Sequence, residues 1–164
     1  MRKRILVVDD VSDWRAQLKA ILKSEYEVIT VASYEAAMDI VQKRDAELVI
    51  VDLRLSPTDE NNRQGMALLK QLAEYRINSI VLTGYPERAL QQEAQEKYKA
   101  FEFIDKSMVA GNLKYLREVV REAFKLLERI QENQNNAIKA AAALQPVKFT
   151  PDLSPWPLSK YRKE

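Results

Sequence analysis

The chain has 164 residues, of which 26 are basic and 24 acidic, so its formal net charge is only +2. It contains neither cysteine nor histidine, which excludes disulfide frameworks, thiolate or imidazole zinc sites, Ser-His-Asp catalysis and histidine phosphorelay on this chain. No apolar run approaches the roughly 20 residues of a membrane span, and the charge balance does not call for nucleic acid. We therefore expect a cytoplasmic, soluble protein with one main domain.

Short apolar segments alternate with amphipathic ones along most of the chain. The apolar segments predict strands at residues 4–9, 27–31, 47–52, 79–83 and 101–104. The amphipathic segments predict helices, with Ser12 and Ser33 as N-caps of the first two, at residues 13–24, 34–44, 65–75 and 87–98. Alternation of this kind predicts an α/β fold with a doubly wound parallel sheet, whose strands are buried on both faces.

The last predicted helix is longer than one domain needs. It starts near Asn112 and extends to about Leu144, and its apolar residues from Leu113 to Ile130 alternate by three and four positions, which is a heptad pattern. Because about four turns suffice to cover a sheet of this size, we divide the chain into a domain, a helix extension and a proline-rich tail, at residues 1–130, 131–144 and 145–164. We expect the tail to be extended or disordered, and a truncated longer protein is equally compatible with it.

Acidic residues end two of the predicted strands. Asp9 and Asp10 follow the first strand and Asp52 follows the third. The carboxyl ends of parallel strands meet at one edge of a sheet, where open α/β folds bind ligands, so we expect these acids to converge. Carboxylates without thiolate or imidazole favour Mg²⁺ or Mn²⁺. Thr83 and Lys106 end the next two strands, and their hydroxyl and ammonium groups suit phosphoryl oxygens.

The order of these residues, an acid pair, then Asp52, then Thr83 with Gly84, then Lys106, resembles the receiver domain of response regulators in two-component signalling. The resemblance covers about residues 3–130. It implies a flavodoxin-like five-stranded parallel sheet with the strand order 2-1-3-4-5, to which this chain adds an extended C-terminal helix.

The resemblance also implies a role for each site residue. Asp52 is the expected phosphoacceptor, a nucleophile toward phosphorus. The expected Mg²⁺ ligands are Asp9, Asp10, Asp52 and the backbone carbonyl of Arg54. The expected phosphoryl-binding and switch residues are Thr83, Lys106 and Phe103, with the Phe103 ring turning inward when Thr83 moves to the phosphoryl group. Taken singly, Asp10 is also typical of a helix cap and Lys106 of a solvated side chain, so the joint placement carries the interpretation.

Three features depart from the family pattern. The loop 54–64 is longer than usual by roughly five residues, which suits a cover over the site, a partner contact or a tolerated insertion. Ser107 stands where the family has a proline after a cis peptide bond, and we expect either a trans bond with a shifted loop or a strained cis bond. Arg54 and Tyr85 occupy positions that tune water access to the acyl phosphate, and their bulk predicts slow self-hydrolysis.

The resemblance implies a phosphorylation-activated signalling switch. A sensor histidine kinase or phosphotransfer protein is expected to donate a phosphoryl group to Asp52 with the help of Mg²⁺. The signal is expected to pass to a downstream protein partner, or through a homodimer by the C-terminal helix, without direct contact to nucleic acid or membrane. As an enzyme the chain would at most catalyse its own phosphorylation and dephosphorylation.

Two other functions are compatible with a strand-end aspartate. Mg²⁺-dependent phosphatases and phosphotransferases also use such a nucleophile, but they usually carry a second acid two residues later, where this chain has Arg54. The spacing therefore argues against that class. The other alternative is a receiver-like binding module that is never phosphorylated and works through its surface alone.

Overall fold

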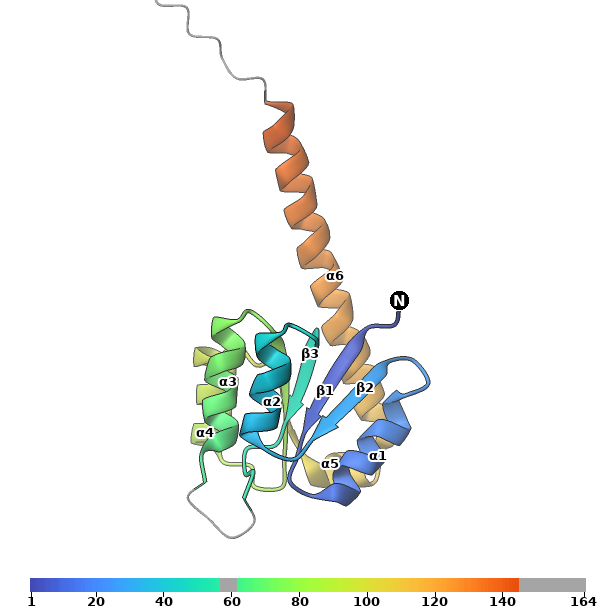
Figure 1. The fold of residues 1–164 in the computed structure, drawn as a ribbon, viewed down its shortest axis with the longest axis vertical. Helices are drawn as coiled ribbons and strands as arrows, with labels where there is room; N and C mark the ends of the chain where they lie inside the picture. The colour runs from blue at the N-terminus through green and yellow to red at the C-terminus, as the bar shows by residue number, and fades with distance from the viewer. Residues whose placement is uncertain (57–61, 145–164) are drawn as a thin grey trace, which may run out of the picture. The chain divides into compact units, whose positions relative to one another are not determined.

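The structure is a computed structural model that describes residues 1–56 and 62–144. Five parallel strands form one sheet in the order β2-β1-β3-β4-β5 (Figure 1). The strands are β1 (Arg4–Val8), β2 (Glu27–Val31), β3 (Leu48–Val51), β4 (Asn78–Thr83) and β5 (Glu102–Asp105). The α/β fold class and the strand order expected from the sequence are confirmed.

Helices cover both faces of this sheet (Figure 1). They are α1 (Ser12–Leu22), α2 (Tyr34–Gln42), α3 (Gln64–Glu74), α4 (Arg88–Gln92), the π-helical turn η1 (Glu93–Lys97), α5 (Lys106–Ala110) and α6 (Leu113–Ala143). The chain divides into two compact units, the first ending at Glu128 and the second beginning at Arg129. Within the described residues, no helix is both long enough and apolar enough to cross a membrane.

Successive strand residues point to opposite faces and build two separate cores. On β1, Ile5 and Val7 pack with α1, α5 and the first part of α6, whereas Leu6 and Val8 pack with α2 and α3. All four side chains are completely buried. Burying one such aliphatic side chain stabilises a fold by about 1.5–3 kcal/mol, which explains why β3 and residues 5–8 of β1 are uninterrupted apolar runs.

The two predicted serine caps have different outcomes. Ser33 caps α2 as expected, because its hydroxyl oxygen accepts a hydrogen bond from the backbone N–H of Ala36 at 3.2 Å. Ser12 was expected to cap the first helix, and this prediction is wrong. Ser12 is the first residue of α1, the N-cap position belongs to Val11, and no side chain caps the helix there.

The helix predicted over residues 87–98 is not a regular α-helix. Its α-helical part, α4, has only five residues and passes into the wider turn η1. There the backbone N–H of Tyr98 reaches the carbonyl of Glu93, five residues back. Sequence periodicity places Ala94 and Tyr98 on one face but does not reveal the extra residue in the turn.

Candidate functional site

The predicted site residues stand at the carboxyl ends of four neighbouring strands. Val8 and Val51 are partners in the β1–β3 register, so Asp9 and Asp52, the next residues along, lie side by side. The backbone N–H of Asp52 donates to the carbonyl of Val8 at 2.9 Å, which extends the pairing to the site itself. Thr83 ends β4.

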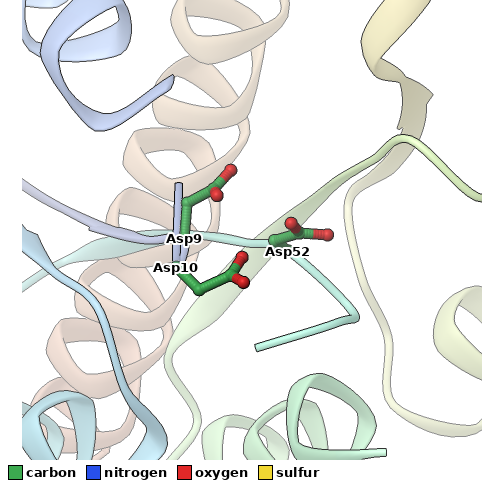
Figure 2. Close-up of side chains that lie close together, drawn as sticks. All are labelled: Asp9, Asp10 and Asp52. Carbon is green, nitrogen blue, oxygen red and sulfur yellow. The ribbon is translucent and has the colours of Figure 1, made fainter. Parts of the chain in front are cut away.

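Three carboxylates converge at this edge (Figure 2). One oxygen from each of Asp9, Asp10 and Asp52 lies within 4.8 Å of the others. Asp9 is 2% exposed and Asp52 6%, whereas Asp10 is half-buried. Ionised carboxylates this close repel one another strongly when water is excluded, so the cluster requires a cation.

Lys106 supplies a positive charge to the two buried carboxylates. Its Nζ lies 2.7 Å from Oδ2 of Asp9 and 2.9 Å from Oδ2 of Asp52. The other oxygen of each carboxylate accepts a backbone N–H from two residues further on, that of Val11 at 2.9 Å and that of Arg54 at 3.4 Å. Each of the two carboxylates is therefore fixed in one orientation, with one oxygen on the Lys106 ammonium and the other on a backbone N–H.

The protonation behaviour of the pair follows from its burial. Burial raises the pKa of the Asp52 carboxyl, and the adjacent Lys106 ammonium offsets this only in part. Burial alone lowers the pKa of Lys106, but its hydrogen bond to Asp9 and the charge of Asp52 raise it by more, so its net pKa lies above the ordinary lysine value. Lys106 is thus a cation at neutral pH.

A short helix that the sequence did not lead us to expect positions Lys106. The lysine is the first residue of α5, and Asp105 is the N-cap, whose carboxylate accepts the backbone N–H of Ser107 at 2.9 Å. The peptide bond between Lys106 and Ser107 is trans, as are all others in the described residues. Of the two possibilities weighed for this bond, the structure has the trans one. A proline at 107 has no N–H and could not make this cap.

Arg54 and Tyr85 meet beside Thr83. The guanidinium carbon of Arg54 lies 3.6 Å from the centroid of the Tyr85 ring, and the hydroxyl oxygen of Thr83 accepts the backbone N–H of Tyr85 at 3.2 Å. The two stacked side chains line a pocket of about 340 Å³, together with Thr83, Leu53 and Met66. The loop after β3 is thereby joined to the loop after β4, next to Asp52.

Phe103 lies on β5 and is half-buried, packed against the core that α2 and α3 cover. The structure therefore brings Asp9, Asp10, Asp52 and Lys106 into direct proximity, with Thr83 on the adjoining strand. It places Phe103 on the following strand rather than in the carboxylate cluster. The middle of the long loop, residues 57–61, and the tail, residues 145–164, lie outside the described residues.

Two further residues shape the site and were not singled out from the sequence. The Trp14 ring, in the first turn of α1, lies 5.0 Å from Nζ of Lys106. No local sequence pattern indicates this contact, because the two residues lie far apart in the sequence. A Cβ atom on Gly65 would lie 2.4 Å from the carbonyl oxygen of Asp52. The first turn of α3 therefore packs directly on the backbone that carries Asp52, and only glycine fits there.

Comparison with known proteins agrees with this geometry. A family profile described as the response regulator receiver domain matches residues 5–121. The chain belongs to this family. A curated relative, sporulation initiation phosphotransferase F of Bacillus subtilis (strain 168), is 31% identical to this receiver domain over 99 residues, which are 58% of this chain and 76% of the relative.

Solved structures show the same receiver fold. A CheY-like receiver domain protein from Methanospirillum hungatei is 25% identical, with a TM-score of 0.57, over 74% of this chain and 99% of that one. The receiver domain of an HD domain-containing protein from Pseudomonas fluorescens has a TM-score of 0.68 at 22% identity, over 79% of this chain and 99% of that one. Receiver domains are the phosphorylation-controlled switches of two-component signalling, and this chain is one of them.

Proposed function

We propose that Asp52 of this receiver domain accepts a phosphoryl group from a sensor histidine kinase or a phosphotransfer protein. The observation that carries the proposal is the double contact of Lys106 with Asp9 and Asp52 at the strand ends. It leaves a buried carboxylate beside a cation, in a site that also contains the hydroxyl of Thr83. An electrophilic phosphorus atom that enters this site finds a nucleophile and partners for its oxygens.

The donor set fits Mg²⁺, or Mn²⁺ as the alternative. Three carboxylate oxygens within 4.8 Å of one another are hard ligands of the kind these ions take. We propose Asp9, Asp10 and Asp52 as ligands, with the backbone carbonyl of Arg54 as a fourth. When bound, the ion neutralises charge on the cluster and on the transferring phosphoryl group.

The protein groups divide the transfer between them. An oxygen of Asp52 forms the new bond to phosphorus, while the bond to the donor nitrogen breaks and its electron pair leaves with the donor. Lys106 exchanges its contact with the Asp52 carboxylate for a phosphoryl oxygen, and the Thr83 hydroxyl donates to another. The movement of Thr83 allows the ring of Phe103 to turn inward, which is the switch.

The switch is read through protein contacts in this proposal. The receiver domain spans about residues 1–130, and the helix extension over 131–144 offers a surface for a downstream protein or for a second copy of the chain. No direct contact with nucleic acid or membrane is part of the proposal. We also propose that the protein is cytoplasmic, because we expect the phosphoryl donor to be there.

Phosphorylation by acetyl phosphate with Mg²⁺ tests the proposal. We expect intact-mass spectrometry to show one added phosphoryl group on the parent and none on Asp52→Ala, and Asp39→Ala, which changes an exposed carboxylate on α2, to behave like the parent. Omitting Mg²⁺ should slow the labelling strongly. Steady release of inorganic phosphate without a labelled species would favour a phosphatase instead. Absence of labelling in the parent would favour a binding module that is never phosphorylated.

A further inference from the structure

The second part of α6 presents an apolar face that nothing in the described residues covers. In the first unit, heptad positions of α6 such as Leu116, Val120 and Ala123 are buried against the sheet. The same heptad frame continues through the second unit. We call its positions there the α6 seam, which consists of Ile130, Gln134, Ala137 and Ala141 on α6 and of Leu144, the residue directly after the helix. Every residue of the seam is exposed, with Ile130 at 44% and Leu144 at 77%.

Charged residues are kept away from this seam. Between residues 129 and 144 they are Arg129, Glu132 and Lys139, all on the side of the helix opposite the seam. The positions that flank the seam carry only uncharged side chains, Gln131, Asn133, Ile138 and Ala140. In paired helices, charges at the flanking positions select the partner and repel copies of like sign. Two copies of this helix meet without such repulsion.

Gln134 identifies the partner as a second copy of the chain. It is the polar member of an otherwise apolar seam. In a parallel pair that is in register, the two Gln134 amides face each other and can exchange hydrogen bonds, as buried polar residues at such positions do. Against an aliphatic residue of another protein, the amide would be buried without a partner, at a cost in free energy.

A lipid surface is a poorer match for the same face. Helices that lie on membranes combine a polar face rich in lysine and arginine with tryptophan or phenylalanine on the apolar face. Here the polar face mixes one acidic residue with two basic ones, and the apolar face holds no aromatic residue between residues 129 and 144.

We propose that the α6 seam pairs with the α6 seam of a second copy as a parallel, in-register two-stranded coiled coil. The proposed function includes a contact with another protein, and here that protein is a second copy of the chain. In this respect the inference rests on the proposed function. The pairing itself needs no phosphoryl group. Sixteen residues rise only about 24 Å, and alanine fills two seam positions, so the dimer is weak and depends on concentration.

Sedimentation equilibrium of the full chain tests the pairing. From about 5 to about 500 µM we expect a monomer–dimer equilibrium, with a dissociation constant inside this concentration range. Ile130→Glu places a charge in the seam and should raise the dissociation constant at least about tenfold. Asn136→Glu, a change on the opposite side of the helix, should leave it unchanged. A monomer at the highest concentration, or equal effects of both substitutions, would overturn the proposal.

Cross-linking tests the orientation, because the chain contains no cysteine of its own. Under mild oxidation we expect Ala141→Cys to form a disulfide with itself and Asn136→Cys to form much less. If Ala141→Cys links only to Ile130→Cys in a mixture, the helices are antiparallel and the proposal is wrong. We expect the Ala141→Cys disulfide also in the Asp52→Ala background. A failure of pairing is thereby distinguished from a failure of phosphorylation, since each has its own readout.

Discussion

Burial in the fold disfavours the ionised form of the Asp52 carboxyl. Burial raises its carboxyl pKa above the ordinary value of 3.8, and the contact with Lys106 offsets only part of that increase. An aspartate with a raised pKa binds its proton more tightly in the folded than in the unfolded chain. Its ionisation therefore lowers the free energy of unfolding as pH rises through the folded-state pKa. In the proposed function this loss of stability is tolerated because Asp52 must be ionised to attack phosphorus.

The first prediction concerns Asp52→Asn, which removes the buried negative charge and keeps the shape. At pH 7 without Mg²⁺ we expect a larger free energy of unfolding than in the parent, because the parent must ionise Asp52 in a buried site. The difference should shrink as pH falls toward 4, since the parent then gains its proton. Urea unfolding at both pH values measures it. Asp39→Asn, on the surface, should change little. A less stable Asp52→Asn at pH 7 would contradict the expectation.

The second prediction concerns Lys106→Met. It leaves Asp9 and Asp52 buried without their common cation, and breaking a buried ion pair from one side typically costs about 3–5 kcal/mol. We therefore expect a large drop in the free energy of unfolding. Mg²⁺ should recover more stability in this variant than in the parent, because the ion can replace the missing charge. Thermal unfolding with and without Mg²⁺ measures both effects; equal Mg²⁺ responses in the two proteins would argue against a metal at these carboxylates.

The third prediction concerns the stack of Arg54 on Tyr85, which closes one side of the site. A cation–π contact is worth about 1 kcal/mol, so removing it should shorten the lifetime of the acyl phosphate by about fivefold. Arg54→Ala and Tyr85→Ala should act alike, and the double variant little more than either, because both break one contact. Loss of label from phosphorylated protein measures the lifetime.

Arg44→Ala is a matched control for the third prediction. It removes a similar contact, with Tyr75, between the ends of α2 and α3, remote from the strand ends that carry Asp52. It should therefore leave the lifetime unchanged. Parent-like lifetimes in both Arg54→Ala and Tyr85→Ala would show that the stack does not control water access.

At the scale of elements, strand ends and their acids were predictable, whereas the starts of α1 and α5 were not. A run of aliphatics that stops at Asp52 can be read directly from the sequence, because burial on both faces allows few other residues. Helix α5 has no comparable pattern. It consists of five residues and begins where the Asp105 carboxylate caps the backbone, a local hydrogen bond that periodicity does not display. The only sequence feature at this position is Ser107, which stands where the family has a proline.

Other local features escaped prediction for the same physical reason. Serine is a common N-cap residue, but Ser12 is already inside α1, because the helix begins one residue earlier than expected. The backbone N–H of Val11, at the N-cap position, donates to the side chain of Asp9. The packing of Gly65 against Asp52 is a contact between residues far apart in the sequence, and no short window contains both. The site residues could be predicted because they directly follow strands. The contacts that support them could not be predicted, because no local sequence pattern indicates them.

The fourth prediction concerns this packing of α3 under the nucleophile. Gly65→Ala should lower the free energy of unfolding by about 1–3 kcal/mol, as overpacking does, because the new Cβ would overlap the backbone of Asp52 and Leu53. It should also slow phosphorylation, since the nucleophile must shift. Gly111→Ala is the control, because a Cβ there meets nothing within 4 Å. Urea unfolding and labelling rates measure the two effects, and equal stability of both variants would contradict the close approach.

At the scale of the whole molecule, the first unit contains the complete sheet and both cores. Its last buried side chain on α6 is Phe124, which stacks on Tyr26 with ring centroids 5.1 Å apart. Lys3 lies over the same ring and pairs with Glu128. The contacts that the sheet needs from α6 thus end at about the point where the second unit begins.

The fifth prediction concerns where α6 can be cut. A chain that ends at Glu128 should unfold cooperatively, with a midpoint within a few degrees of the full chain, since it keeps every buried residue of α6. A chain that ends at Glu122 loses Phe124 and should be destabilised by about 3–5 kcal/mol, the usual cost of deleting a buried phenylalanine side chain. Thermal unfolding distinguishes the two. Similar midpoints for both would show that residues 123–128 contribute little to the core.

The position of Lys106 between two acids has a consequence for the protein in the cell. Because Lys106 contacts both Asp9 and Asp52, part of the negative charge of the carboxylate cluster is balanced without divalent metal. We therefore expect a newly made chain to reach its final shape before any ion binds, and to keep that shape if a bound ion is lost. Metal scarcity would then silence the signal without exposing the protein to degradation, and the response could resume as soon as the ion returned.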